Sequence, residues 1–136
     1  MRQIMFICWT ALSIVSCHSA KEKTPLGGVK WIAETLQGKK IKMKEEGSEV
    51  FFLLDTLEKR VNGKAGCNRF FGDYVRYKEK LSFRSLGATK AFCQDMAVEL
   101  AFFQVLESTD SFVIKNDQLR LKHEGKVIAV FKAEKK

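Results

Sequence analysis

The sequence predicts a mainly β fold, a sandwich or a barrel, with one main helix. Three observations support this class. Short segments with a residue period of two recur about every ten residues along the chain. One segment, 95–106, has the spacing of an amphipathic helix instead. Pairs that favour tight turns lie between the strand-like segments: Glu46-Gly47, Asn62-Gly63, Asn116-Asp117 and Glu124-Gly125.

Seven segments have strand periodicity: 39–44, 49–54, 70–77, 81–83, 112–115, 119–122 and 127–132. Within 49–54, Val50, Phe52 and Leu54 share one face, which we expect to be buried. Within 119–122, Leu119 and Leu121 share the predicted core face. The last segment is apolar on both faces.

The helical segment has a wide apolar surface. Asp95 is the expected N-cap, and Glu99 lies near the positive end of the helix dipole. We expect the helix to pack deeply against the sheet, at one end of a barrel if the sheet closes. The predicted stripe is Met96, Leu100, Phe103 and Leu106, with Val98, Phe102 and Val105 beside it.

Length and composition indicate one globular domain. The chain has 136 residues, of which 46% are apolar and 29% are charged. This composition excludes wholesale disorder and collagen-like structure. Lys and Arg number 24 against 16 Asp and Glu, which gives a formal charge of +8.

The first residues have the pattern of an exported lipoprotein. A positive start, Met1-Arg2-Gln3, precedes the uncharged segment 4–16. As a helix this segment would extend about 20 Å, short of the ~30 Å of a bilayer core. Residues 14–17, Ile-Val-Ser-Cys, resemble the bacterial lipobox. We expect residues 1–16 to be a removed signal peptide and Cys17 to be lipidated; an ordinary secreted protein and an uncleaved anchor are the alternatives.

The mature chain would then have three parts and a formal charge of +7, because Arg2 is lost. We expect a flexible tether over 17–28, a folded domain over 29–133 and a charged tail over 134–136. The lipid on Cys17, including palmitate, would hold the domain in the cell envelope. Because His18 and not Asp follows Cys17, the outer membrane is favoured, with the domain facing the periplasm or the cell surface.

The cysteines predict one disulfide. Cys8 would leave with the signal peptide and Cys17 would carry lipid, so that Cys67 and Cys93 remain as a pair in an oxidising compartment. A disulfide between them would contribute about 3.5 kcal/mol in the chain-entropy model. Free thiols are the alternative. A redox-active pair is disfavoured because the spacing is not Cys-x-x-Cys and neither cysteine has an adjacent histidine.

Two motifs carry a family resemblance: Gly-Cys-Asn-Arg-Phe-Phe-Gly-Asp-Tyr at 66–74, and Leu-Gly-Ala-Thr-Lys-Ala-Phe-Cys at 86–93 followed by Glu99. Together they resemble the META domain (HslJ-like) family, over about residues 31–131. Ala91 departs from the pattern, which usually has methionine there. The resemblance implies a small, mostly antiparallel domain that is barrel-like in outline, opened by a strand at Trp31. It implies no established reaction, and it associates such proteins with envelope stress, heat or drug resistance, and virulence.

The family motif supplies the candidate site residues. We interpret the segment 66–74 as a tight corner pinned by the disulfide, and a loop that faces a ligand is the alternative. In this interpretation Gly66 and Gly72 bracket the bend. The full set is Gly66, Cys67, Asn68, Phe71, Gly72, Tyr74, Thr89, Cys93 and Glu99.

The sequence offers no catalytic constellation, and we expect no enzyme, no metal and no cofactor. Glu99 could sit in a cavity with a raised pKa, but we expect it to cap backbone or to pair with Lys90 or Arg69. The histidines of the mature chain, His18 and His123, do not complete a zinc-binding pattern with the two cysteines. We expect His123 to be a solvated turn residue.

Basic residues cluster in two places: Lys39, Lys40, Lys42 and Lys44, and then Arg69, Arg76, Lys78 and Lys80 among aromatic residues. Export argues against nucleic acid as a partner. A solvated strand face is the simplest interpretation, and contact with anionic lipid headgroups is the alternative.

The leading hypothesis is a monomeric, membrane-anchored envelope lipoprotein with a non-catalytic binding or protective role in stress tolerance. Its partners would be the bilayer, through the Cys17 lipid, and an envelope protein or small apolar ligand. One alternative is a carrier with an apolar pocket between helix 95–106 and the sheet. The other is an inhibitor of a wall-directed hydrolase, although the +7 charge opposes a strongly basic target.

Overall fold

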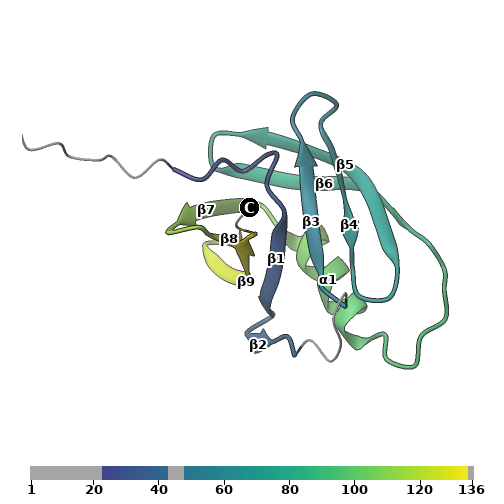
Figure 1. Ribbon diagram of the computed structural model, residues 1–136. Coiled ribbons are helices and arrows are strands. Elements are labelled where there is room, and N and C mark those ends of the chain that lie inside the picture. Colours follow the sequence, from purple (N-terminus) through teal and green to yellow (C-terminus); the bar gives the residue numbers. More distant parts are fainter. Residues whose placement is uncertain (1–22, 43–47, 135–136) are drawn as a thin grey trace, which may run out of the picture.

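The computed structural model describes residues 23–42 and 48–134. In that part of the chain, one antiparallel sheet closes in a ring, in the order β2-β1-β3-β4-β5-β6-β7-β8-β9, because β1 also pairs with β9 (Figure 1). The single connecting helix found there joins β6 to β7. The predicted mainly β fold with one main helix is therefore confirmed. The elements are β1 (Trp31–Leu36), β2 (Lys39–Lys40), β3 (Phe51–Asp55), β4 (Arg60–Lys64), β5 (Arg69–Tyr77), β6 (Lys80–Ala88), α1 (Ala97–Ser108), β7 (Ser111–Lys115), β8 (Gln118–His123) and β9 (Lys126–Ala133).

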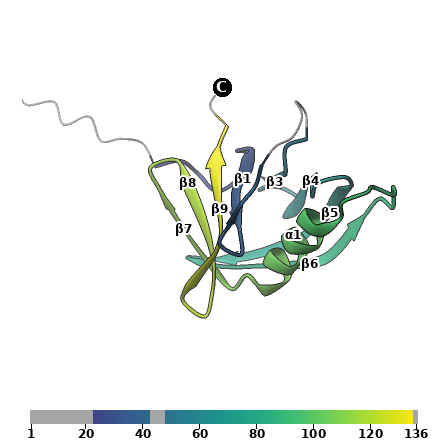
Figure 2. The ribbon, with the colours of Figure 1, turned by 90° about the horizontal axis from the view of Figure 1, so that it is seen from below.

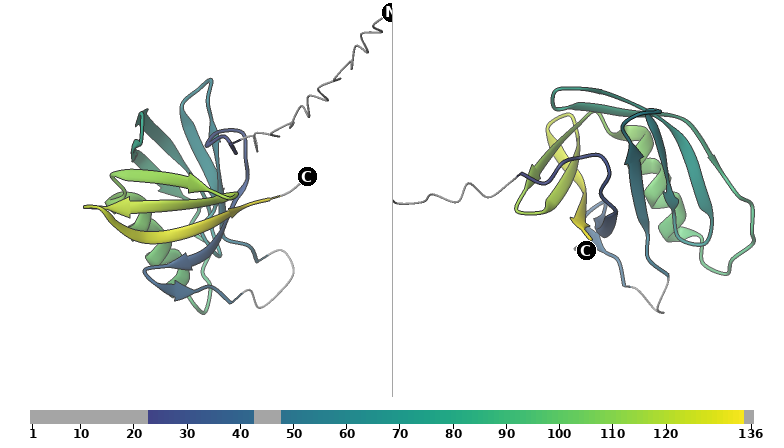
Figure 3. Two further views of the ribbon diagram at one scale, coloured as in Figure 1. Left: turned by 90° about the vertical axis from the view of Figure 1, so that its left-hand side faces the viewer. Right: turned by 45° about the horizontal axis from the view of Figure 1, so that its top comes forward.

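The strands form two groups in space. Figures 2 and 3 show β7, β8 and β9 together on one side of the molecule and β3 to β6 on the other. The ring is weakest between β6 and β7, where Lys80 and Ser111 alone are paired. The helix α1 packs against β6 and β1. None of the helices in the described residues is long and apolar enough to cross a membrane.

Local turn chemistry accounts for two of the predicted hairpins. Asn116 and Asp117 have φ values of 52° and 59° and join β7 to β8. Glu124 and Gly125 have φ values of 47° and 78° and join β8 to β9. Positive φ at both central positions gives the twist that suits a two-residue hairpin, so both predicted turns are confirmed.

The predicted turn at Asn62-Gly63 is wrong, because both residues lie inside β4. A Cβ atom on Gly63 would lie 2.0 Å from the carbonyl oxygen of Phe51, so glycine is needed there for close approach of two strands. The actual turn follows Asp55, whose Oδ1 accepts hydrogen bonds from the N–H groups of Leu57 and Glu58 at 2.8 and 3.0 Å.

Other strand boundaries differ from the prediction by extension or shortening. The segment 81–83 is part of the longer strand β6. The segment 39–44 contributes only β2, since Ile41 and Lys42 follow as coil and 43–44 lie outside the described residues. The predicted turn at Glu46-Gly47 also lies outside them.

Aromatic side chains fill the interior. The ring of Phe52 in β3 lies 4.9 Å from that of Phe131 in β9 and 6.0 Å from that of Phe83 in β6, centroid to centroid. From the helix, Phe102 approaches Phe70 of β5 at 5.1 Å and Phe131 at 6.3 Å. One edge-to-face cluster therefore links both groups of strands with α1. The predicted core faces of 49–54 and 119–122 are buried in it: Val50, Phe52, Leu54, Leu119 and Leu121.

The predicted apolar stripe of the helix is partly wrong. The buried residues of α1 are Glu99, Phe102, Val105 and Leu106. Leu100, predicted to lie on the core stripe, is 61% exposed, and Phe103 is only partly buried. Burial of Glu99 turns the helix so that positions 99, 102 and 106 face inward, which carries position 100 outward.

The helix starts two residues after the predicted N-cap. Met96 occupies the N-cap position, and Asp95 lies just before it. Asp95 nevertheless satisfies a free donor of the first turn, since its Oδ1 accepts a hydrogen bond from the N–H of Ala97 at 3.0 Å. Asp95 therefore caps the start of the helix as predicted, but from the position before the N-cap.

The expected tether contributes to the folded part. Leu26 is buried, and its carbonyl oxygen accepts a hydrogen bond from the indole Nε1 of Trp31 at 2.8 Å. The N–H of Gly28 donates to the carbonyl of Leu54 at 3.0 Å, and the hydroxyl of Thr24 donates to Asp117. Residues 24–28 therefore belong to the folded part, because they dock on the sheet.

Candidate functional site

The two family motifs meet at one end of α1. The turn between β4 and β5 carries Gly66, Cys67 and Asn68, and the connection from β6 to α1 carries Thr89 and Cys93. The carbonyl of Asn68 accepts a hydrogen bond from the N–H of Ala65 at 2.9 Å, which closes the turn. Gly66 has a φ of +140°, and it packs over the backbone of Glu99. A residue with a side chain would be strained at this φ.

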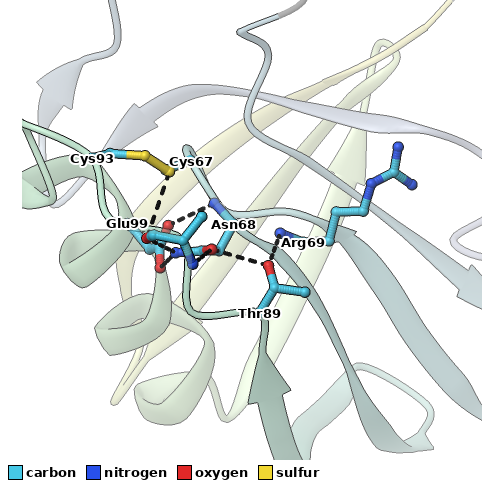
Figure 4. Close-up of a disulfide and its surroundings, with 7 residues drawn as sticks. Cys67, Asn68, Arg69, Thr89, Cys93 and Glu99 are labelled. Carbon is cyan, nitrogen blue, oxygen red and sulfur yellow. Dashed lines mark hydrogen bonds between the residues drawn. A yellow bond between two sulfur atoms is a disulfide. The ribbon is translucent and has the colours of Figure 1, made fainter.

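Asn68 is the centre of the site. Its side chain is 2% exposed and makes four hydrogen bonds (Figure 4). The amide Nδ2 donates to Glu99 Oε1 at 3.0 Å and to the carbonyl of Ala91 at 3.2 Å. The amide Oδ1 accepts from the Ala91 N–H at 2.7 Å and from the Thr89 hydroxyl at 3.0 Å. Every hydrogen-bonding position of this amide is used inside the protein.

Glu99 is buried at 6% exposure and binds Asn68 twice. Besides the bond from Nδ2, its Oε2 accepts from the backbone N–H of Asn68 at 2.9 Å. Of the two structural roles expected for Glu99, backbone capping is confirmed. The ion pairs found among the described residues do not include one from Glu99 to Lys90 or Arg69.

Thr89 extends the strand pairing between β5 and β6 by one step. Its backbone N–H donates to the carbonyl of Arg69 at 3.0 Å. Its hydroxyl accepts from the N–H of Arg69 at 3.2 Å while donating to Asn68. The side chain thereby replaces the backbone carbonyl that a continuing strand would have provided.

A disulfide joins Cys67 to Cys93, with the two Cα atoms 6.3 Å apart and 26 positions between them in sequence. The predicted pairing is confirmed. The bond ties the two motifs together beside Asn68 (Figure 4). Phe92, between the anchored residues Ala91 and Cys93, is 95% exposed.

The rest of the family motif lies in β5, away from the bend. Gly72, expected to bracket the corner, is inside the strand beside a bulge in the pairing with β6. A Cβ atom there would lie 2.9 Å from the carbonyl oxygen of Arg84, so the bulge requires glycine. Phe71 is half exposed and lies over Gly87.

Tyr74 is buried and links β5 to the start of the β3–β4 turn. Its hydroxyl donates to the carbonyl of Asp55 at 3.2 Å. Desolvation by burial raises the pKa of Tyr74, and the nearby Asp55 carboxylate raises it further. The phenol therefore stays protonated over a wider pH range and serves as a hydrogen-bond donor.

The arrangement around Asn68 is a closed structural network. In the described part of the chain, no buried side-chain nitrogen or oxygen lacks a hydrogen-bond partner. The same residues contain no group of three or more side chains suited to holding a metal ion. His123, expected in a turn, ends β8, half exposed, with Nδ1 at 3.5 Å from Asp110 Oδ2.

The surface of the described residues carries grooves at two places that bear on binding. The larger, about 1190 Å³, lies on the outer face of β1, β8 and β9. The other, about 540 Å³, lies between α1 and the β1–β2 hairpin. Each combines residues that are far apart in the chain. The smaller groove lies at the junction of helix and sheet where the sequence analysis placed the apolar pocket of a carrier, whereas the larger groove has no counterpart in the sequence analysis.

Known proteins resemble this chain in two ways, by their solved structures and by a family model. A solved structure from Burkholderia xenovorans is similar with a TM-score of 0.65, at 22% identity, over 82% of this chain and 85% of that one. A second solved protein has a TM-score of 0.59, at 22% identity, over 79% and 90% of the two chains. The comparison with curated proteins gives no match. The family model of the META domain matches residues 24–135, and the chain therefore belongs to the META domain family.

Proposed function

We propose that this protein is an HslJ-like, membrane-anchored envelope lipoprotein that acts by binding, without catalysis, in tolerance of envelope stress. One observation carries the proposal. The only polar network at the family motif uses its donors and acceptors internally, among the residues described, so that it offers no free group to a substrate. Function would then reside on the outer surface.

The packed interior favours surface binding over an enclosed carrier. Trp31, Phe52, Phe70, Phe102 and Phe131 are fully buried in one core cluster. A ligand of typical size needs a cavity of about 300–1000 Å³. The grooves of about 540 and 1190 Å³ in the described residues lie at the surface, between elements. A bound ligand or protein would therefore contact exposed side chains.

The anchor would hold this surface close to the bilayer. The proposed lipid is on Cys17, and among the described residues, which start at 23, Thr24 is the first to bind the sheet. Seven residue steps span at most about 25 Å. Two or more acyl chains on one residue give stable membrane attachment. A binding partner would thus be met at the membrane, which suits protection of the envelope.

The proposal is tested with cells that lack the gene and carry either the wild-type chain or Cys17→Ala. We expect the wild-type chain to fractionate with membranes after a high-salt wash and to restore survival under heat or drug stress. Cys17→Ala should be absent from that fraction and restore little. Wild-type survival equal to that of the empty vector would contradict the stress role, and a membrane-bound Cys17→Ala chain would contradict the anchor. A purified protein that turned over an envelope substrate would contradict the non-catalytic role.

A further inference from the structure

The groove between α1 and the β1–β2 hairpin has an apolar floor. It measures about 540 Å³, within the range of small-ligand sites. Leu36 from β1 and Ile41 after β2 line one side of it, and the first two turns of α1 line the other. The side chain of Leu100 is 61% exposed here, although its neighbours on the helix include core residues. The apolar lining residues are Leu36, Ile41, Ala97, Val98, Leu100 and Ala101.

The polar rim of this groove carries charge of one sign. Lys39, Lys40 and Lys42 line it, and no carboxylate is among the described residues that do so. Its remaining polar residues bind each other, since Gln37 Nε2 donates to Gln104 Oε1 at 2.9 Å and ties the hairpin to the helix. The ammonium groups are therefore the charges available to a ligand.

The larger groove lacks this asymmetry. Its lining includes three carboxylates, from Glu34, Glu49 and Glu134. The same lining includes three cations, from Lys40, Arg120 and Lys132. Such a mixed surface gives no net attraction to either sign of charge. A negatively charged ligand would therefore be attracted to the groove beside α1 and not to the larger groove.

We propose that the groove between α1 and the β1–β2 hairpin binds an anionic amphiphile with one long alkyl chain, of the fatty-acid class. The alkyl chain lies on Ile41, Val98 and Leu100, and the carboxylate lies among the lysines of the rim. Apolar contact supplies non-directional attraction, and the cations orient the ligand. This inference rests on the proposed binding role, for which it names the ligand.

The first test locates the ligand on the full chain in cell membranes. A palmitate analogue with a photoreactive diazirine in its chain is added, the sample is irradiated, and labelled peptides are mapped by mass spectrometry. We expect adducts within 36–42 and 97–104.

Leu100→Glu, which puts a charge on the apolar wall, should lower this labelling about tenfold. The matched control is Val113→Glu on β7, at a site that is 41% exposed and lines neither groove, and its labelling should equal that of the wild type.

The second test isolates the role of charge. The triple variant Lys39→Gln, Lys40→Gln, Lys42→Gln should lower labelling by palmitate about threefold to tenfold. Labelling by the corresponding long-chain alcohol, which has no charge, should be low in the wild type and unchanged in the variant. A palmitate signal as strong in the triple variant as in the wild type would overturn the assignment of the carboxylate.

A control triple variant removes the same number of charges elsewhere. Lys59→Gln, Lys115→Gln and Lys126→Gln lie on exposed positions outside the groove. We expect full labelling of this variant. An equal loss in both triple variants would mean that net charge and not the rim attracts the ligand, and the proposal would fail.

Failure of this inference can be told apart from failure of the binding role. Adducts outside the two peptides, or none in wild-type protein, would overturn the proposed ligand, and a cross-link between two chains at the groove would identify a second copy as its occupant. Stress survival is measured in the same strains. Survival that depends on Leu100 without fatty-acid labelling would leave the binding role standing with a different ligand.

Discussion

The carboxylate of Glu99 accepts two hydrogen bonds from Asn68, one from its backbone N–H at 2.9 Å and one from its side-chain Nδ2 at 3.0 Å. This contact joins the β4–β5 turn to the first turn of α1 across 31 positions of sequence. Cys67, the residue before Asn68, forms a disulfide with Cys93, and this bond joins the same turn to the connection before α1. The helix is therefore held at its start by two long-range contacts, one polar and one covalent.

The first prediction concerns the charge of Glu99. Glu99→Gln keeps the shape but presents an NH₂ group to one of the two Asn68 donors, which leaves a buried donor without its acceptor. We expect the free energy of unfolding to fall by about 1–3 kcal/mol. Denaturant unfolding measures it, with Glu107→Gln, on the exposed side of the same helix, as the control that should change little. Unchanged stability together with lost stress survival would instead make Glu99 a functional carboxylate, and the non-catalytic proposal would have to be withdrawn.

The second prediction concerns the disulfide. Cys93→Ser opens a loop of 26 positions, and we expect a loss of about 2–4 kcal/mol in unfolding free energy. A reducing agent should destabilise the wild-type protein by a similar amount and leave Cys93→Ser unaffected. Thiol labelling of native, unreduced protein provides the check. Two reactive thiols at Cys67 and Cys93 would contradict the bond.

Short-range chemistry explains what the sequence predicted well. Asn116-Asp117 and Glu124-Gly125 form the expected turns because three of these four residues, Asn116, Asp117 and Gly125, tolerate positive φ. Asn62-Gly63 has the same local signal, but its glycine serves the approach of β3 to β4. That requirement depends on the partner strand, which the sequence does not reveal.

The site was predictable in its residues but not in its connections. The motif identified Asn68, Thr89 and Glu99, whereas the partner that accounts for two of the four Asn68 side-chain bonds is the backbone of Ala91. Every residue except proline has the same backbone N–H and C=O groups, so the residue type at position 91 does not reveal these bonds. For the same reason, alanine in place of the family's methionine does not remove them. The place of the groove beside α1, between the helix and the sheet, was suggested by the sequence, but its lining was not, because Leu100 was predicted to be on the core stripe and is exposed instead.

The third prediction is a dependence of stability on pH through Asp110. The N–H of Glu124 and the hydroxyl of Ser111 donate to this carboxylate and hold its pKa below the usual range, with a smaller effect from His123. A pKa lowered by folding stabilises the protein above the unfolded value of about 4, and this contribution is lost as the pH falls through the folded pKa. Asp110→Asn should therefore be less stable than wild type at neutral pH, and the difference should shrink as acid is added.

Denaturant unfolding over a pH series measures this difference. Because hydrogen bonds are its main cause, most of it should remain at about 1 M salt, where charges are screened beyond about 3 Å. A difference between Asp110→Asn and wild type that stayed constant down to acid pH would contradict the assigned origin.

The last prediction separates the helix face that the sequence suggested from the face that the structure buries. Phe102 is fully buried between Phe70 and Phe131, so Phe102→Ala should lower the unfolding free energy by about 3–5 kcal/mol through lost transfer energy and a cavity. Phe103 is only partly buried, and Phe103→Ala should cost clearly less. Leu100→Ala should change stability by no more than about 0.5 kcal/mol, because Leu100 lies at the surface. Thermal and denaturant unfolding of the three variants give the order directly. A cost for Leu100→Ala equal to that for Phe102→Ala would restore the stripe predicted from sequence, and it would remove Leu100 from the wall of the groove.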